Sequence, residues 1–144
     1  MYFAKVNTNT YLLRLEKGEQ LNASSKKFCQ EKSIQNASIT ALGSIENPTL
    51  AHYRVDTKKY REERLTGIFE LANLTGTIGM FKGQPFVHTH VTVTDEKMRA
   101  FGGHLVEATV SATVEVFIAD LGTDFGKSHS EEIGLRLWDL PESL

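Results

Sequence analysis

Three of the five histidines lie close together in the sequence, as His88-Thr89-His90 and then His104. The residues from Val87 to Val93 alternate in a way that is typical of a half-buried β-strand. Successive side chains of a strand point to opposite faces, so we expect His88 and His90 on one face and Thr89 on the other. The polar run that follows predicts a hairpin turn, after which the chain returns toward His104.

The length of this turn decides whether His104 reaches the face of the other two histidines, because a one-residue change in register moves every side chain to the opposite face. Two registers achieve this. One pairs Thr94 with Met98, which puts His104 opposite the first histidine, and the other pairs Asp95 with Arg99, which puts it opposite the second. A shared site therefore predicts a loop with an odd number of residues, or a bulge at the preceding glycine pair that restores the parity.

Three imidazoles on neighbouring strands can converge on one divalent metal ion, since facing Cβ atoms lie about 4.5–5.5 Å apart. Catalytic zinc sites commonly use three protein ligands and keep one position open. The single cysteine, Cys29, is distant in the sequence, so the pattern offers no sulfur ligand. Zinc, nickel, iron(II) and manganese all remain open, because geometry rather than affinity selects among them. The alternative is three ordinary strand histidines, exposed or bonded to the backbone.

Two carboxylates are candidates for an acid or base beside such a metal. Glu70 ends the run Gly67-Ile68-Phe69-Glu70, and Glu107 follows His104 by three residues. A metal with an open position can polarise a carbonyl when an acid or base lies close. Either carboxylate could instead orient a ligand histidine through its second nitrogen. A solvent contact or an ion pair is the alternative for both.

The composition is that of an ordinary soluble globular domain, with 144 residues, 40% of them hydrophobic and 24% charged. The sequence has no run of 18 apolar residues and no secretory signal pattern at its start. One cysteine gives no disulfide framework, which favours the reducing cytoplasm. The formal net charge of −2 argues against a small free-standing DNA-binding protein, because phosphate contacts need a basic surface.

The hydrophobic pattern predicts one main helix, from Glu19 to Lys32, among many strands. We expect the Asn47-Pro48 dipeptide to form a turn between a hairpin pair of strands. The charged stretch at 57–65 should be a solvent-facing connection or an edge strand. His52 is expected to be hydrogen-bonded or exposed, and His129 to be exposed. The expected strands are 11–15, 38–46, 50–55, 65–80, 87–93, 108–120 and 135–138, with loops at 81–85 and 122–132.

The sequence resembles the PPC domain, the plants and prokaryotes conserved domain, over nearly its whole length. The most specific pieces are GxFE from Gly67, LTGTI from Leu74, HxHV from His88, GGHL from Gly102 and VSATVEV from Val110. The resemblance implies one α+β domain over residues 1–144, with a bent antiparallel or mixed sheet and one main helix, that assembles as a homotrimer. It also implies that the three histidines occupy the zinc site found in some members.

Prokaryotic members of this family are single domains often labelled DNA-binding proteins, whereas plant members add AT-hooks, short Arg-Gly-Arg-Pro segments. No such segment occurs in this sequence. The fold is also similar to that of acetolactate decarboxylase, a zinc enzyme with a comparable histidine arrangement. The leading hypothesis is a PPC-domain protein that binds a divalent metal, with zinc favoured, and is a DNA-binding regulatory protein. The alternatives are a metal-dependent lyase or hydrolase for a small carbonyl or acid substrate, and a metal- or ligand-sensing interaction module.

Overall fold

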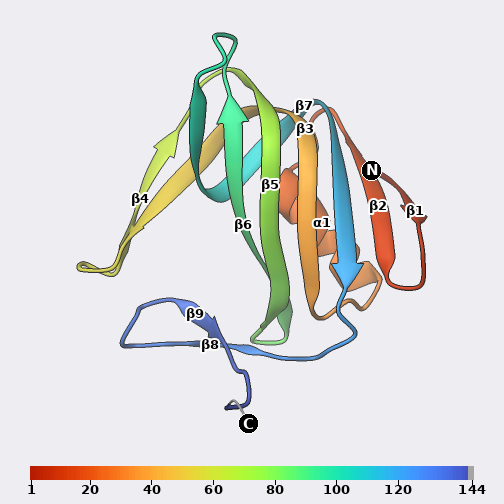
Figure 1. The fold of residues 1–144 in the computed structure, drawn as a ribbon, viewed down its shortest axis with the longest axis vertical. Coiled ribbons are helices and arrows are strands. Elements are labelled where there is room, and N and C mark those ends of the chain that lie inside the picture. Colours follow the sequence, from red (N-terminus) through yellow and green to blue (C-terminus); the bar gives the residue numbers. More distant parts are fainter. Residues whose placement is uncertain (143–144) are drawn as a thin grey trace.

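Antiparallel strands make up most of the protein and wrap around one helix (Figure 1). The computed structural model describes residues 1–142. The elements are β1 (Tyr2–Lys5), β2 (Thr10–Glu16), α1 (Leu21–Glu31), β3 (Ala37–Arg54), β4 (Lys59–Arg64), β5 (Ile68–Phe81), β6 (Gln84–Thr94), β7 (Ala100–Asp120), β8 (Lys127–His129) and β9 (Arg136–Trp138).

The main sheet has the order β1-β2-β7-β6-β5-β3-β4, and every neighbouring pair is antiparallel. The long strands β3 and β7 also pair with each other, so β3, β5, β6 and β7 form a closed ring. This pairing has register shifts, which bend both strands. Gly103 allows one of the close approaches, since an added Cβ there would lie 3.0 Å from the Ala51 carbonyl oxygen.

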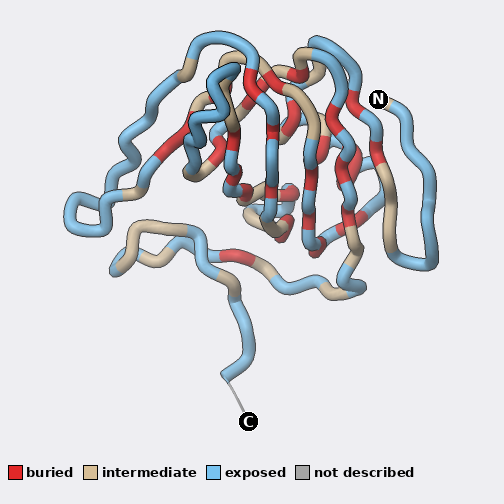
Figure 2. Tube along the Cα trace, turned by 45° about the horizontal axis from the view of Figure 1, so that its top comes forward, coloured by how far each residue is buried: buried red, intermediate tan, exposed pale blue. Residues whose placement is uncertain are grey.

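The hydrophobic core lies between the inner face of this bent sheet and α1, where buried residues follow the inward side of each strand (Figure 2). The helix contributes Leu21, Phe28 and Cys29, all fully buried. Burial, with a smaller effect of Asp120, raises the pKa of the Cys29 thiol to about 12, so this thiol remains protonated at neutral pH. The helix and the inward position of Cys29 agree with the sequence pattern.

The hairpin predicted around Asn47-Pro48 is wrong. The two expected strands are the halves of one continuous strand, β3, and the hairpin partner of its second half is β4. Asn47 has a positive φ of 50°, but its backbone N–H donates to the Gly67 carbonyl and its Oδ1 accepts from the Gly67 N–H. These two hydrogen bonds to Gly67 therefore hold the Asn-Pro segment as a bend inside a strand.

Other element boundaries also differ from the expectation. The predicted loop at 81–85 is a two-residue turn, Lys82-Gly83, with both φ angles positive, as such turns require. The predicted loop at 122–132 contains β8, which pairs with β9 in a small separate sheet. Strand β4 is an exposed edge strand, as expected. No helix within residues 1–142 has the length and apolarity needed to cross a membrane.

Candidate metal centre

The hairpin between β6 and β7 brings His104 opposite His90. The N–H of Asp95 donates to the carbonyl of Arg99 at 3.1 Å, and three residues lie between them. Met98, the last of the three, has the positive φ expected in such loops. The odd loop predicted from the sequence is thus confirmed in the second of its two registers, and no bulge at the glycine pair is needed.

The three imidazoles converge on one point beside the sheet. The ring centroids of His88 and His90 are 5.2 Å apart, those of His88 and His104 are 5.2 Å apart, and those of His90 and His104 are 5.7 Å apart. One nitrogen from each ring lies within 4.8 Å of the other two. Tetrahedral zinc holds its nitrogen ligands about 3.4 Å from one another, so a modest rotation of the rings would close the site around an ion.

The electrostatics of this cluster favour neutral imidazoles, the form that binds a metal. Burial, together with smaller effects of His104, His90 and Lys127, lowers the pKa of His88 to about 4. Burial and His90 also lower the pKa of His104. The Nδ1 atom of His104 is buried without a hydrogen-bond partner within residues 1–142. A buried nitrogen that lacks a partner fits a ligand for a cation, so the residues present suit a metal.

Thr89 points the other way, toward the helix, as alternation predicts. Its hydroxyl donates to Oδ1 of Asn22 at 3.0 Å, and Asn22 Nδ2 donates to the Leu105 carbonyl at 3.0 Å. The Glu107 carboxylate accepts from the backbone N–H groups of Asn22 and Ala23 at 2.8 and 3.0 Å. Glu107 therefore caps the start of α1 and lies on the face opposite the histidines. The metal centre proposed below does not include it.

Glu70 lies on β5 opposite Thr94, four residues beyond His90 on β6. Four residues of strand span about 13 Å, so Glu70 is far from the three imidazoles. Its side chain is exposed in a surface hollow near the β6–β7 turn. His52 and His129 lie outside the cluster as well. His52 is exposed on β3, and the Nε2 of His129 lies 3.7 Å from Oε1 of Glu131.

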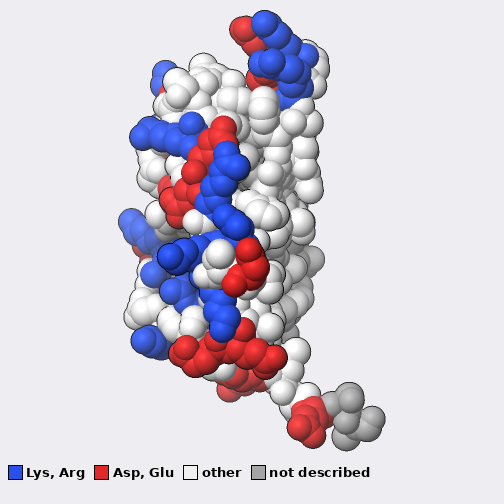
Figure 3. Space-filling model, turned by 90° about the vertical axis from the view of Figure 1, so that its left-hand side faces the viewer, with Lys and Arg blue, Asp and Glu red and all other residues white. Residues whose placement is uncertain are grey.

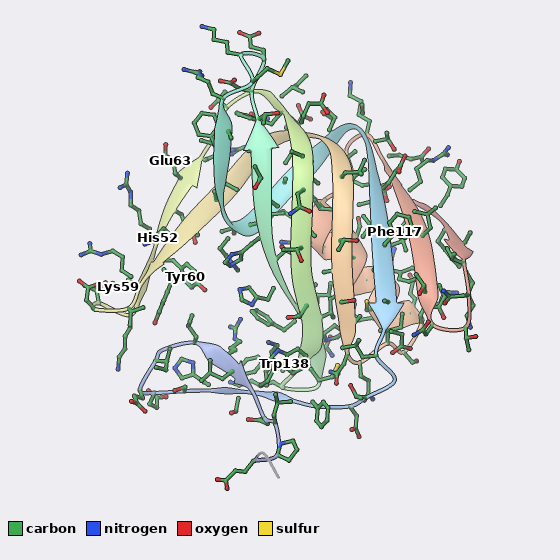
Figure 4. The ribbon with its side chains drawn as sticks, viewed as in Figure 1. His52, Lys59, Tyr60, Glu63, Phe117 and Trp138 are labelled. Carbon is green, nitrogen blue, oxygen red and sulfur yellow. The ribbon has the colours of Figure 1, made fainter. Side chains whose placement is uncertain are left out.

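Tyr60 of β4 lies against the cluster, and the sequence pattern did not identify it. Its ring centroid is 5.2 Å from that of His104 and 4.9 Å from that of Tyr53. Burial and Tyr53 raise the pKa of Tyr60, an effect that Arg136 partly offsets. Lys59 and Tyr60 leave the strand on opposite sides (Figure 4). The sequence did contain a signal, because Tyr60 is the one aromatic residue in a charged stretch. In an alternating strand, such a residue is expected to face the protein while its charged neighbours face solvent.

The β8–β9 hairpin crosses the end of the sheet near the same face. Gly79 of β5 leaves room for it, because an added Cβ would overlap the ring of Trp138 (Figure 4). The ammonium of Lys127 lies 3.9 Å from the centroid of the Trp138 ring. Burial lowers the pKa of Lys127. The sequence pattern predicts a loop at 122–132 and a strand at 135–138, and nothing in it connects this hairpin with the site.

Residues 2–122 match the Plants and Prokaryotes Conserved (PCC) domain, also abbreviated PPC, and the chain belongs to this family. This confirms the resemblance found in the sequence motifs. The matched range includes all three histidines of the cluster and ends before the β8–β9 hairpin.

Solved structures of similar proteins cover nearly the whole chain. A PPC protein from Pyrococcus horikoshii is 34% identical with a TM-score of 0.88, over 94% of each chain. A putative DNA-binding protein from Bacteroides thetaiotaomicron is 28% identical with a TM-score of 0.92, over 96% of each chain. A metal-containing protein from Archaeoglobus fulgidus is 31% identical with a TM-score of 0.86, over 96% of this chain and 98% of the other.

Two further similarities are more limited. A Staphylococcus aureus protein similar to α-acetolactate decarboxylase is 16% identical with a TM-score of 0.59, over 82% of this chain and 55% of the other. It shares the fold alone. The bifunctional protein GlmU from Synechococcus is 30% identical over 112 residues, and the chain spans only 17% of its length.

Proposed function

We propose that this PPC-domain protein binds one divalent metal ion, with zinc favoured, through His88, His90 and His104. The convergence of three imidazole nitrogens within 4.8 Å carries the proposal. The unpartnered Nδ1 of His104 and the lowered pKa of His88 support it, because both favour a cation in place of protons. The similar Archaeoglobus fulgidus protein is metal-containing, which adds independent support.

Three protein ligands leave a coordination position open for a ligand. A bound divalent ion would supply Lewis-acid chemistry at that position. Burial favours the neutral forms of His88 and His104, the register of the hairpin fixes His104 opposite His90, and Tyr60 lies against the His104 ring. This arrangement supports a metal-dependent lyase or hydrolase for small carbonyl compounds or acids as a second candidate function. Ligand sensing would use the same open position without turnover.

Elemental analysis of the purified protein tests the metal proposal. We expect about one zinc or similar ion per chain in the wild type and none in a His88→Ala/His90→Ala variant. A His52→Ala variant is the matched control, since His52 is also a strand histidine but lies outside the cluster. A wild type that holds no metal after reconstitution with zinc, nickel, iron(II) or manganese would contradict the proposal.

We also propose a homotrimer, as the family resemblance implies. Leu42 and Phe117 support it, because they are 54% and 42% exposed and lie on the same outward face of β3 and β7. Exposed apolar side chains that adjoin one another favour an interface. Analytical ultracentrifugation should give three chains for the wild type and one for a Leu42→Lys/Phe117→Lys variant. A Val55→Lys variant, in the exposed β3–β4 turn, should remain a trimer.

Regulatory DNA binding is the remaining proposal, supported by the DNA-binding designation of the Bacteroides thetaiotaomicron protein. Within the described residues, the face that contains β4 has no continuous basic surface for phosphate contacts, because basic and acidic side chains are mixed across this face (Figure 3). Arg61 and Glu63 of β4 lie 3.7 Å apart, as one instance of this mixing. Fluorescence anisotropy with a labelled duplex tests the proposal. DNA binding predicts an affinity that falls steeply with salt, and no binding at low salt would contradict it.

A further inference from the structure

The β8–β9 hairpin places a buried lysine on the histidine face of the sheet. Lys127 is 7% exposed, and an added Cβ at Gly79 would lie 3.0 Å from its Cε atom. Gly79 pairs with Phe86 across β5 and β6, and Thr77 pairs with His88 in the same register. Paired residues share a face, and so do residues two apart along one strand. The side chain of Lys127 therefore lies on the face of His88, two residues farther along the strands.

The positive charge of Lys127 has no acidic partner within residues 1–142. Its ammonium lies over the Trp138 ring, and it forms neither a salt bridge nor a side-chain hydrogen bond in the described part of the chain. Lysine side chains are seldom this buried without a counter-charge, and the ammonium of Lys127 keeps contact with solvent, where an anion can reach it. Arg136, the cation of β9, is likewise placed over the rings of Phe81 and Phe86, at 4.6 and 4.5 Å.

We propose that Lys127 is the charge partner of a small carboxylate that binds at the open position of the three-histidine centre. The inference rests on the proposed metal site and names the class of ligand that it takes. A carboxylate has two oxygens, so it can meet a metal and an ammonium at once. The aromatic rings of Trp138 and Phe86 suit the carbon end of such a ligand.

Cobalt(II)-loaded protein provides the test, because the visible absorption of cobalt changes when a ligand enters its coordination sphere. The wild type, Lys127→Gln and Lys127→Arg are each titrated with acetate and, separately, with imidazole. Acetate is the anionic probe, and imidazole is a neutral probe of the open position. Lys97→Gln is the matched control, because Lys97 is an exposed lysine in the β6–β7 turn and its loss removes the same charge.

We expect the dissociation constant for acetate to rise about tenfold or more in Lys127→Gln, because a charge-assisted hydrogen bond is lost. It should recover in part in Lys127→Arg and remain unchanged in Lys97→Gln. Imidazole should bind all four proteins alike, which would show that the metal centre remains intact in each. Equal acetate affinity in Lys127→Gln and the wild type, with cobalt retained, would overturn this inference alone. A wild type that takes up no cobalt would overturn the metal centre and this inference together.

Discussion

The two faces of β6 carry polar side chains that differ in their hydrogen bonding. On the helix side, Thr89 bonds to Asn22, and Asn22 in turn bonds to the backbone of β7 and to Glu107. On the other side, His88 and His90 meet a histidine whose Nδ1 is buried without a partner within residues 1–142. A satisfied buried network stabilises a fold, whereas an unsatisfied one marks a place for a ligand. The difference separates the face of this strand that stabilises the fold from the face that we propose binds a metal.

Loss of a histidine should have the largest effect. We expect His104→Ala to weaken zinc binding by roughly a hundredfold or more, because two imidazoles remain as ligands. Thr89→Val, on the opposite face of the neighbouring strand, should leave zinc affinity nearly unchanged and lower stability by about 1–2 kcal/mol. Competition with a chromophoric chelator measures the affinity. Equal losses of zinc affinity in the two variants would show that the faces are not separate.

Loss of the helix cap should lower the stability of the fold and leave zinc affinity unchanged. Glu107→Ala removes the acceptor for two N–H groups at the start of α1, so we expect a loss of about 2 kcal/mol in the free energy of unfolding. Urea denaturation measures it. Glu96→Ala is the matched control, since Glu96 is an exposed carboxylate in the β6–β7 turn, and its loss should change stability little. A Glu107→Ala variant of normal stability that binds zinc weakly would instead assign Glu107 to the metal centre.

The pH dependence of stability should follow the histidine face. The pKa of His88 falls from 6.5 to about 4 on folding, and the pKa of His104 also falls. The unfolded chain therefore takes up protons first as the pH falls. The contribution of these groups to stability is complete above pH 6.5 and is lost as the pH falls toward 4.

Urea denaturation of the metal-free protein across this range measures the effect. Thr89→Val should keep the decline seen in the wild type, whereas His88→Ala should flatten it. An unchanged decline in His88→Ala would assign the pH dependence to other groups.

The smallest effect should come from the residue that only flanks the centre. Tyr60→Ala removes the ring beside His104, and we expect zinc affinity to fall about two- to fivefold, as for the loss of one aromatic contact. The same chelator competition measures it. Tyr2→Ala, which removes an exposed ring of β1, should have no effect. A loss as large as that in His104→Ala would mean that Tyr60 acts on the metal directly.

The histidine cluster could be predicted from the sequence because it depends on local rules. Strand alternation and the parity of a short loop together place three side chains on one face, and both are visible between His88 and His104. The same alternation bears on Glu107, the candidate acid or base. Glu107 lies three residues after His104, an odd separation, so on a strand it faces the other way.

The surroundings of the cluster depend on long-range pairing, which the sequence does not display. Tyr60 reaches His104 because β3 continues through Asn47-Pro48 and carries β4 alongside the ring of strands. Lys127 reaches the histidine face because Gly79 leaves room for Trp138 some sixty residues later in the chain. Neither Asn-Pro nor a lone glycine reveals such contacts, because their usual meaning is a turn or a bend.

The most direct test of the metal centre is an anomalous diffraction measurement at the zinc absorption edge on crystals of the zinc-loaded protein. The account predicts one peak per chain, about 2.0–2.1 Å from one nitrogen each of His88, His90 and His104. It also predicts no protein ligand from the helix face, where Thr89, Asn22 and Glu107 lie. An absent peak, or a peak bound away from these three rings, would contradict the central claim.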